Sequence, residues 1–267
     1  MQQSILFTRL AAVAVTLIGT VLALPSAQAD DPEFPGVVGP KVATSQLGLG
    51  IAVADTEVQY RGKDNSTSLI PLILYDNQYL HVFGNTVDLK LPSLSHLHFA
   101  VRAKYALGDG YKASQSDYLY GMAERKGGLW LGGAASWDSQ LVTLSASWTK
   151  ATNDSKGQQF EVNAEHGFRS GRFQLTPHVG VVRSDKKYVD YYYGVRPDEV
   201  RADRPAYAGT DAATEVSAGV RVNYALSRQQ MLLLDVSDTH RGSAITDSPL
   251  VDKASTPSVK AGYLYLF

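Results

Sequence analysis

Apolar and polar residues alternate at every second position through most of the chain after residue 45. In the segment 46–55 one parity is apolar and the other holds small residues: Leu47, Leu49, Ile51 and Val53 against Gly48, Gly50, Ala52 and Ala54. The same period recurs in 96–105, 129–137, 141–149, 160–166, 172–182, 215–224 and 231–238. A period of two places side chains on opposite faces of a β-strand. The pattern therefore predicts an all-β protein.

The length of these runs favours a barrel that spans a membrane over a β-sandwich, in which strands also alternate. The runs reach about ten residues, enough for a tilted strand to cross a bilayer. Aromatic residues lie at the ends of the apolar parity, where an interfacial girdle would form: Tyr105, Trp137, Trp148, Tyr224 and Phe267. A sheet in lipid must close, because lipid cannot satisfy its edges.

Connection lengths give a second argument for the same fold. Short turns near 76–77, 91–96, 137–140, 168–172 and 226–230 alternate with long loops at 56–66, 107–126, 151–157, 184–212 and 241–255. Short periplasmic turns and longer external loops are typical of bacterial outer-membrane barrels. We predict a transmembrane antiparallel outer-membrane β-barrel of about twelve strands, with 78–91 as two short strands joined at Gly84–Asn85. If 78–91 is one irregular strand, about ten remain.

The amino-terminal segment predicts export. Arg9 precedes an apolar run (10–24) and a small-residue cleavage motif (27–29), which together indicate a cleaved signal peptide, 1–29. A Pro/Gly-rich periplasmic extension (30–45) and the barrel (46–267) would follow. With no cysteine the chain has neither disulfides nor a lipid-acceptor thiol. A net charge of −1 argues against a nucleic-acid partner.

The carboxy-terminal strand carries the expected assembly signal for the barrel-assembly machinery. Its alternate positions are Val259, Ala261, Tyr263, Tyr265 and Phe267. We expect this face to contact outer-membrane lipid, because a period-two strand in a barrel turns its apolar parity outward.

Charged residues fall on the opposite parity, which we expect to face the lumen because charge is costly against lipid. The predicted lumen charges are Asp88, Lys90, Arg102, Lys104, Glu161, Glu165, Glu215, Arg221 and Asp235, with Arg172 and Lys260 on the same parity. Mixed signs are compatible with a narrow selective pore or with a plug of ion-paired side chains. Both interpretations stay open.

The segment 186–212 is the candidate interaction loop. It concentrates tyrosine and arginine, which are enriched at binding hot spots; the candidates are Tyr191, Tyr192, Tyr193, Arg196, Arg201, Arg204 and Tyr207. These residues could instead pack on the barrel rim and pair with neighbouring carboxylates.

Catalytic, metal and cofactor sites are not predicted. His96 and His98 supply only two imidazoles, which is incomplete for a metal site. His240 beside Asp238 is the best candidate for an acid–base pair, but a polar strand end next to Arg241 is the favoured interpretation. Nucleophile-elbow, metal-helix and phosphate-loop motifs are absent, so we predict no enzyme.

Several stretches resemble the MipA/OmpV family of outer-membrane proteins. The likeness is carried by 60–80, LGDGY (107–111), YYYGVRPDEVRADRPAYAG (191–209) and the end of the chain (248–267). It implies an outer-membrane barrel, and in some members a scaffold that links a lytic transglycosylase to a penicillin-binding protein. In other members it implies adhesion.

Two hypotheses about function follow. The first is the scaffold, which must present a surface to the periplasm, where the predicted topology leaves only the short turns and the extension 30–45. That extension could be a docking peptide or a plain leader, and if neither it nor the turns bind, the inside–outside assignment is inverted. The alternative is a surface adhesin or a narrow porin-like channel that uses the long loops.

Overall fold

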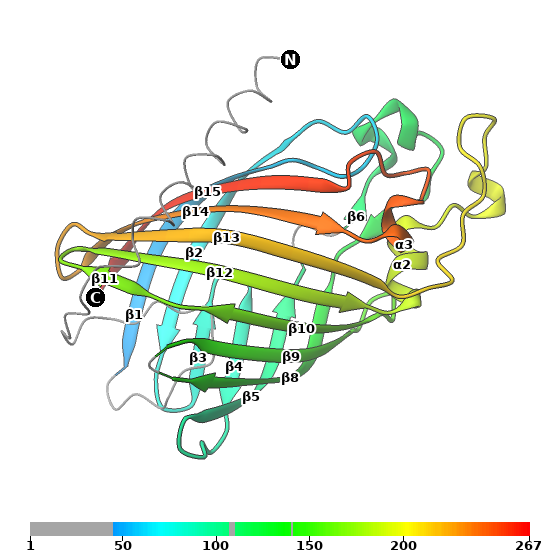
Figure 1. Ribbon diagram of the computed structural model, residues 1–267. Coiled ribbons are helices and arrows are strands. Elements are labelled where there is room, and N and C mark those ends of the chain that lie inside the picture. The colour runs from blue at the N-terminus through cyan, green and yellow to red at the C-terminus, as the bar shows by residue number, and fades with distance from the viewer. Residues whose placement is uncertain (1–44, 107–109, 140) are drawn as a thin grey trace.

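The computed structural model describes residues 45–106, 110–139 and 141–267 (Figure 1). The predicted signal peptide and all but residue 45 of the predicted extension lie outside the described residues. The elements are β1 (Gln46–Thr56), β2 (Ser66–Asp76), β3 (Leu80–Phe83), β4 (Thr86–Lys90), β5 (Leu97–Tyr105), β6 (Gly110–Tyr111), η1 (Ala113–Gln115), η2 (Asp117–Leu119), β7 (Arg125–Lys126), β8 (Leu129–Asp138), β9 (Thr143–Ala151), β10 (Gln158–Glu165), β11 (Phe168–Ser170), β12 (Phe173–Ser184), α2 (Lys186–Tyr193), η3 (Pro197–Glu199), β13 (Ala213–Ala225), β14 (Gln230–Arg241), α3 (Ser243–Thr246) and β15 (Ser255–Leu266).

Twelve strands close into one antiparallel barrel, as the sequence predicts. The neighbours run β10-β9-β8-β5-β4-β3-β2-β1-β15-β14-β13-β12, and β12 pairs back with β10 to close the ring. β11 continues β10, because both pair with β12 in succession. β6 and β7 form a separate two-stranded sheet that is not part of the barrel wall.

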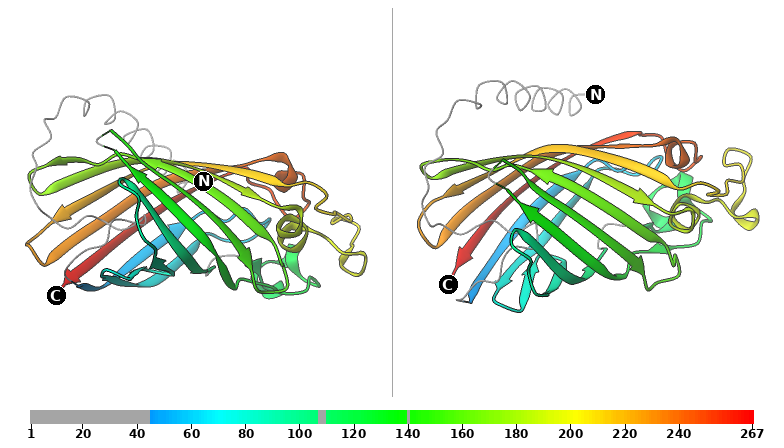
Figure 2. Two further views of the ribbon diagram at one scale, coloured as in Figure 1. Left: turned by 90° about the horizontal axis from the view of Figure 1, so that it is seen from below. Right: turned by 60° about the horizontal axis from the view of Figure 1, so that its bottom comes forward.

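The two ends of the barrel differ, as the alternating connections predict. The long connections lie at one end, which we call the loop end; their described residues are 57–65, 106, 110–128, 152–157, 185–212 and 242–254, and Figures 1 and 2 show α2, α3 and β6 gathered there. The short connections lie at the other end, the turn end; their described residues are 77–79, 91–96, 139, 141–142, 166–172 and 226–229. Functional surfaces can therefore be assigned to one end or the other.

The wall presents an apolar belt outward. On β1, Leu47, Leu49, Ile51 and Val53 are exposed while Ala52 and Ala54 are buried. Aromatic side chains mark both ends of this belt: Tyr105 and Trp148 towards the loop end, Trp137 and Phe267 towards the turn end, all exposed. Within the described part of the chain, no helix has the length and apolar character needed to cross a membrane.

The hairpin β3–β4 is much shorter than its neighbours. Segment 78–91 forms two short strands joined at Gly84–Asn85, as predicted, and β3 has only four residues. Gly84 adopts a φ of +56°, and a Cβ added there would meet no heavy atom within 4 Å. Glycine is therefore required by the backbone and not by crowding.

Replacing Gly84 by alanine should cost about 1–2 kcal/mol, the usual penalty of a left-handed residue with a Cβ. Gly133→Ala is the matched control, because its φ is not in the left-handed region and its Cβ would make an ordinary 3.7 Å contact with the Ala100 carbonyl. Urea unfolding in lipid vesicles measures both variants. Equal stability of the two would contradict this account of the turn.

Candidate functional site

Tyrosines pack the loop end into a cap. Asp185 caps the start of α2, and its carboxylate accepts a hydrogen bond of 3.0 Å from the Tyr188 N–H. The helix buries Tyr188, Val189, Tyr192 and Tyr193 among side chains from the other long connections. The buried cluster comprises Val58, Tyr60, Tyr111, Leu119, Met122, Trp130, Ala151, Tyr188, Val189, Tyr192, Tyr193, Val195, Ala213, Ile245, Leu250 and Val251, and we call it the loop cap. It covers the loop end of the lumen.

One carboxylate ties two cap segments together. Glu199 accepts from the Arg125 guanidinium at 2.8 and 2.9 Å, and the two side chains are 2% and 1% exposed. The Ala123 and Arg196 N–H groups also donate to this carboxylate, at 2.9 and 3.0 Å. The Glu199 carbonyl in turn accepts from Arg204 at 2.7 and 3.0 Å. Segments 110–126 and 186–212 are therefore locked together by a fully partnered ionic network.

The electrostatics of the cap follow from this burial. Burial alone would raise the pKa of Glu199, but hydrogen bonds from Arg196 and Ala123 and the charge of Arg125 outweigh it and hold that pKa below its usual value. Burial raises the pKa of Tyr111 to about 12, against the opposing charge of Arg125. At neutral pH the cap thus contains an ionised Glu199 and a neutral Tyr111.

The candidate interaction loop is divided between the cap and the surface. Tyr192, Tyr193 and Arg204 are buried in the cap, and Tyr191 packs over Arg125 at 5.8 Å. Arg196 is exposed, while Arg201 pairs with the exposed Asp203 at 2.8 Å. Tyr207 is half-buried. The buried members cannot touch an external ligand without opening the cap, so their visible role is packing.

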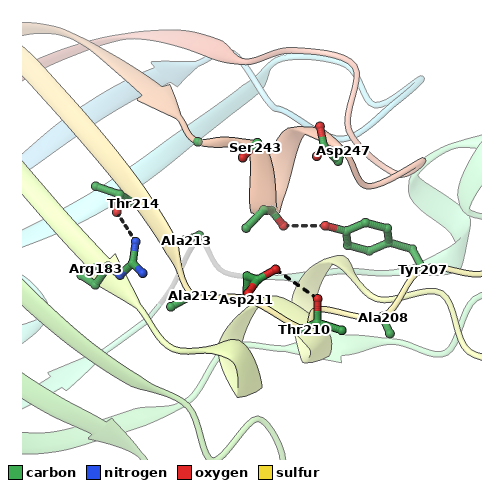
Figure 3. Close-up of a pocket in the computed structure, with 12 residues that line it drawn as sticks. Arg183, Tyr207, Ala208, Thr210, Asp211, Ala212, Ala213, Thr214, Ser243 and Asp247 are labelled. Atoms are coloured by element: carbon green, nitrogen blue, oxygen red, sulfur yellow. Dashed lines mark hydrogen bonds between the residues drawn. The ribbon is translucent and has the colours of Figure 1, made fainter.

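An external groove of about 550 Å³ lies beside this loop (Figure 3). Tyr207 crosses it and donates a hydrogen bond of 2.9 Å to the Ala244 carbonyl of α3, and Arg183 donates to Thr214 at 2.7 Å. Burial raises the pKa of Tyr207, and Asp247 and Asp211 add to the shift. The groove is polar and open, with its one arginine already engaged.

The predicted lumen charges meet partners of opposite sign. Asp88 accepts two hydrogen bonds from Arg102 at 2.8 and 2.7 Å. The other pairs are Lys90–Asp76, Lys104–Glu161 at 3.9 Å, Glu165–Arg221 at 3.5 Å, Arg221–Asp235 at 3.6 Å and Glu215–Arg241 at 3.1 Å. Arg172 lies outside the lumen, exposed at the turn end, where it donates to the Leu226 carbonyl. Sequence parity named both partners of four of these six pairs but missed Asp76 and Arg241 in the other two.

Side chains fill the turn half of the lumen. Leu72, Leu74, Met231, Leu264 and Leu266 form a buried apolar cluster there. Polar neighbours on the facing strands are also buried, namely His81, Asp88, Lys90, His98, Ser136, Thr176 and Asn223. Between this packed half and the loop cap lies a cavity of about 790 Å³. The lumen is thus filled with side chains in its turn half and hollow beneath the loop cap.

Three of the six histidines lie next to single aspartates. His98 contacts Asp138 at 3.2 Å and His178 contacts Asp235 at 3.1 Å, while His81 lies 3.5 Å from Asp76. His96 is exposed at the turn end, and His240 and Asp238 are both exposed at the loop end of β14. In the ranges that the structure covers, no cluster of three or more His, Asp or Glu could hold a metal ion.

The predicted assembly face of β15 alternates with its lumen face. Val259, Ala261, Tyr263 and Tyr265 are each more exposed than the lumen-facing Leu264 and Leu266, and Phe267 is exposed at the turn end. Tyr265 and Phe267 contact each other edge to face at 5.0 Å. The Phe267 N–H donates to the Leu47 carbonyl at 2.8 Å, which joins the end of the chain to β1.

Comparison with known proteins shows which family the barrel belongs to. The model of the family described as MltA-interacting protein MipA matches residues 47–267. The chain belongs to the MipA family. Outer membrane protein Omp26La of Vibrio anguillarum is 30% identical over 189 residues, 69% of each chain. Outer membrane protein OmpV of Vibrio cholerae serotype O1 is 29% identical over 212 residues, 78% of this chain and 76% of the relative.

A third relative bears the name of the family. MltA-interacting protein of Escherichia coli (strain K12) is 25% identical over 233 residues, covering 84% of this chain and 92% of the relative. Relatives of this MipA-family chain are named as outer membrane proteins, and its fold is a closed barrel with an apolar belt. It is an outer-membrane β-barrel of the MipA/OmpV type.

Proposed function

We propose that this protein is a non-enzymatic scaffold that binds a lytic transglycosylase, together with a penicillin-binding protein, at its turn end. The observation that carries the proposal is the family match, because the family is described by its interaction with MltA. Short turns of outer-membrane barrels face the periplasm, where murein enzymes act. The binding surface must therefore include the turn end or the extension 30–45.

The turn end offers an apolar surface that suits a protein partner. Tyr79, Leu94 and Leu141 are 57%, 67% and 82% exposed, and they belong to three successive turns along the barrel rim. Exposed apolar side chains that gather on one rim are typical of interaction sites. We call these three residues the turn patch.

The two packed layers of the lumen support a role without solute flux. The loop cap covers one end, and buried side chains fill the turn half. Ion pairs engage most of the predicted lumen charges, Lys260 excepted. A barrel built this way presents surfaces, and this favours the scaffold over the alternative of a channel.

Replacing Leu94 and Leu141 by aspartate should weaken capture of the transglycosylase by more than about tenfold, the usual consequence of removing hot-spot side chains. Tyr120→Asp is the matched control, because Tyr120 is 74% exposed at the loop end. Capture is measured with the purified, detergent-solubilised barrel and the soluble enzyme. A further variant lacks residues 30–45.

The outcomes separate the two periplasmic surfaces. Loss of capture in the turn variant alone assigns binding to the turn patch, and loss in the shortened variant alone assigns it to the extension. Undiminished capture by both variants, with barrels that remain folded, would rule out the scaffold at this end.

A further inference from the structure

The wall of the barrel has an opening beside β2. β2 pairs with β1 along its whole length, from Ser66 to Asp76. On its other side only Leu74, Tyr75 and Asp76 pair with the short β3. Among the residues that the structure describes, no strand pairs with the remaining edge, Ser66–Leu72, which is about 20 Å long at the usual rise per residue.

The sequence of this edge suits an unpaired position. The Ile73 carbonyl accepts a hydrogen bond from the Gly84 N–H, so it points away from β1. Backbone groups of every second residue point to the same side of a strand, so those of Pro71, Leu69 and Thr67 also point towards the opening. Pro71 has no N–H, and proline within sheets is confined to such edges. Leu69 is 69% exposed, against 44% for Ile73, which has strands on both sides.

An open edge has a consequence in a bilayer. Lipid cannot satisfy the backbone groups of Thr67 and Leu69, and irregular edges are tolerated at membrane depth where they border a water-filled cavity. Such a cavity is present. The 790 Å³ space beneath the loop cap is lined by Leu69 and Pro71 of the edge, by Asn85 of the hairpin tip, and by lumen residues such as Lys104 and Trp130. The unpaired edge thus borders the cavity, and we call it the lateral opening.

The chemistry changes from the opening inward. Leu69, Ile70 and Pro71 are apolar, whereas the interior holds four cations (Lys63, Lys104, Arg241 and Lys260) and three carboxylates (Glu57, Glu161 and Glu215). The carboxylates have cations of their own, in Lys253, Lys104 and Arg241. Among the described residues, Lys63 and Lys260 take part in none of the ion pairs within 4.0 Å, although Asp235 of β14 lies opposite Lys260 in the strand register. The cavity lining therefore carries one cation more than it has carboxylates, and Lys63 and Lys260 are its two cations outside these ion pairs.

Lys260 faces the cavity close to the lateral opening. It points into the lumen and is nevertheless exposed, because it faces the cavity. In the strand register it lies opposite Ala54 of β1, which lies opposite Ser68 of β2. Two strand spacings, roughly 10 Å, and only small side chains thus separate its backbone from the open edge.

We propose that a long-chain fatty acid enters from the membrane through the lateral opening and binds in this cavity. Its hydrocarbon chain lies along Leu69, Ile70 and Pro71, and its carboxylate meets Lys260 and Lys63. The volume is within the range of about 300–1,000 Å³ that single small ligands occupy. The site lies at the loop half of the barrel, so it is independent of partner binding at the turn end.

Palmitate binding to the full-length mature barrel tests the charge part of the proposal. Lys63→Gln/Lys260→Gln should weaken palmitate by about tenfold or more, because hydrogen bonds to charged groups are lost. Lys112→Gln is the control, since Lys112 is exposed in the loop segment outside the cavity. Cetyltrimethylammonium, a cation of similar chain length, should not compete with palmitate.

A second experiment tests the path. The chain has no cysteine, so Leu69→Cys can be labelled with a bulky maleimide without side reactions. Leu49→Cys, on the outward face of β1, is the matched control. Labelling at 69 should block palmitate binding and labelling at 49 should not.

Each result bears on the proposal. A native barrel that binds no palmitate, or binding that survives both the paired lysine changes and the block at 69, would overturn it. So would equal competition by the cationic amphiphile. Intact transglycosylase capture alongside such results would leave the scaffold function standing.

Discussion

Glu199→Ala is expected to open the loop cap while leaving the barrel closed. The change removes the carboxylate that partners Arg125 and leaves a guanidinium that is 1% exposed without its counter-ion. Breaking a buried pair from one side costs about 3–5 kcal/mol. The cap is connected to the wall through loops, so this loss falls on the cap. Trypsin should then cut within 186–212, while gel mobility without heating still reports a folded barrel.

Glu124→Ala is the control for that experiment, because Glu124 lies in the same segment as Arg125 but is exposed. Its ion pairs with Lys112 and Lys126 are long, at 3.9 and 3.8 Å. Exposed pairs contribute about 0–1 kcal/mol, so this variant should stay resistant to trypsin. If Glu199→Ala is cut no faster than Glu124→Ala, the network does not hold the cap.

Acid should act in the same direction. The pKa of Glu199 is lower in the folded protein than its usual value, so its stabilisation is complete above the usual carboxyl range. The stabilisation is lost as the pH falls through the lower, folded-state pKa. Trypsin is replaced by pepsin for this measurement, and Glu199→Gln should remove this part of the pH dependence.

Leu234→Arg is expected to destabilise the whole barrel by about 2–4 kcal/mol, the cost of a cation on the lipid face near the bilayer midplane. Leu234 is exposed on the outward parity of β14, between Val222 of β13 and Ala261 of β15. These neighbours offer the arginine no polar partner. Urea titration in lipid vesicles, followed by tryptophan fluorescence, gives the free energy of unfolding.

Thr239→Arg on the same strand is the comparison, because Thr239 faces the cavity where water can hydrate a charge. We expect its stability to lie within about 1 kcal/mol of the unchanged protein, since lumen substitutions are tolerated. A smaller loss for Leu234→Arg than for Thr239→Arg would mean that the face of β14 assigned to lipid is wrong.

The barrel could be predicted because its information is local. A period of two along each strand and alternating loop lengths do not depend on knowing which residues meet. Even the hairpin 80–90 could be predicted from the sequence, since Gly84–Asn85 is a recognisable turn signal between short apolar runs. The lumen charges were predicted in the same way, because parity alone separates them from the lipid face, but this prediction was wrong for Arg172, which is exposed at the turn end.

Packing of 186–212 on the barrel rim was an open alternative from the sequence, but the partners within the cap could not be predicted because they are distant along the chain. Arg125 and Glu199 are 74 residues apart and meet only after the strands between them are in place. The tyrosines of 191–193 were identified as a candidate surface, yet two of them are buried, since composition does not distinguish packing from binding. Two features could have been recognised from local sequence signals. Asp185 is a residue type that caps helices and marks the start of α2. Pro71 within the otherwise regular strand β2 marks the unpaired edge at the lateral opening.

The seam between β1 and β15 sets the order of events when the barrel forms. Thr56 and Ser258, which share a hydrogen bond of 2.9 Å across this seam, are separated by 202 residues. Pairings between such distant segments form slowly, because the entropy of closing a long loop is lost before the contact stabilises anything. Until β15 docks, both β1 and β14 present bare edges that invite pairing with other chains. The slow step of biogenesis is therefore expected to be this final closure, and a chaperone that shelters two sheet edges at once would accelerate it most.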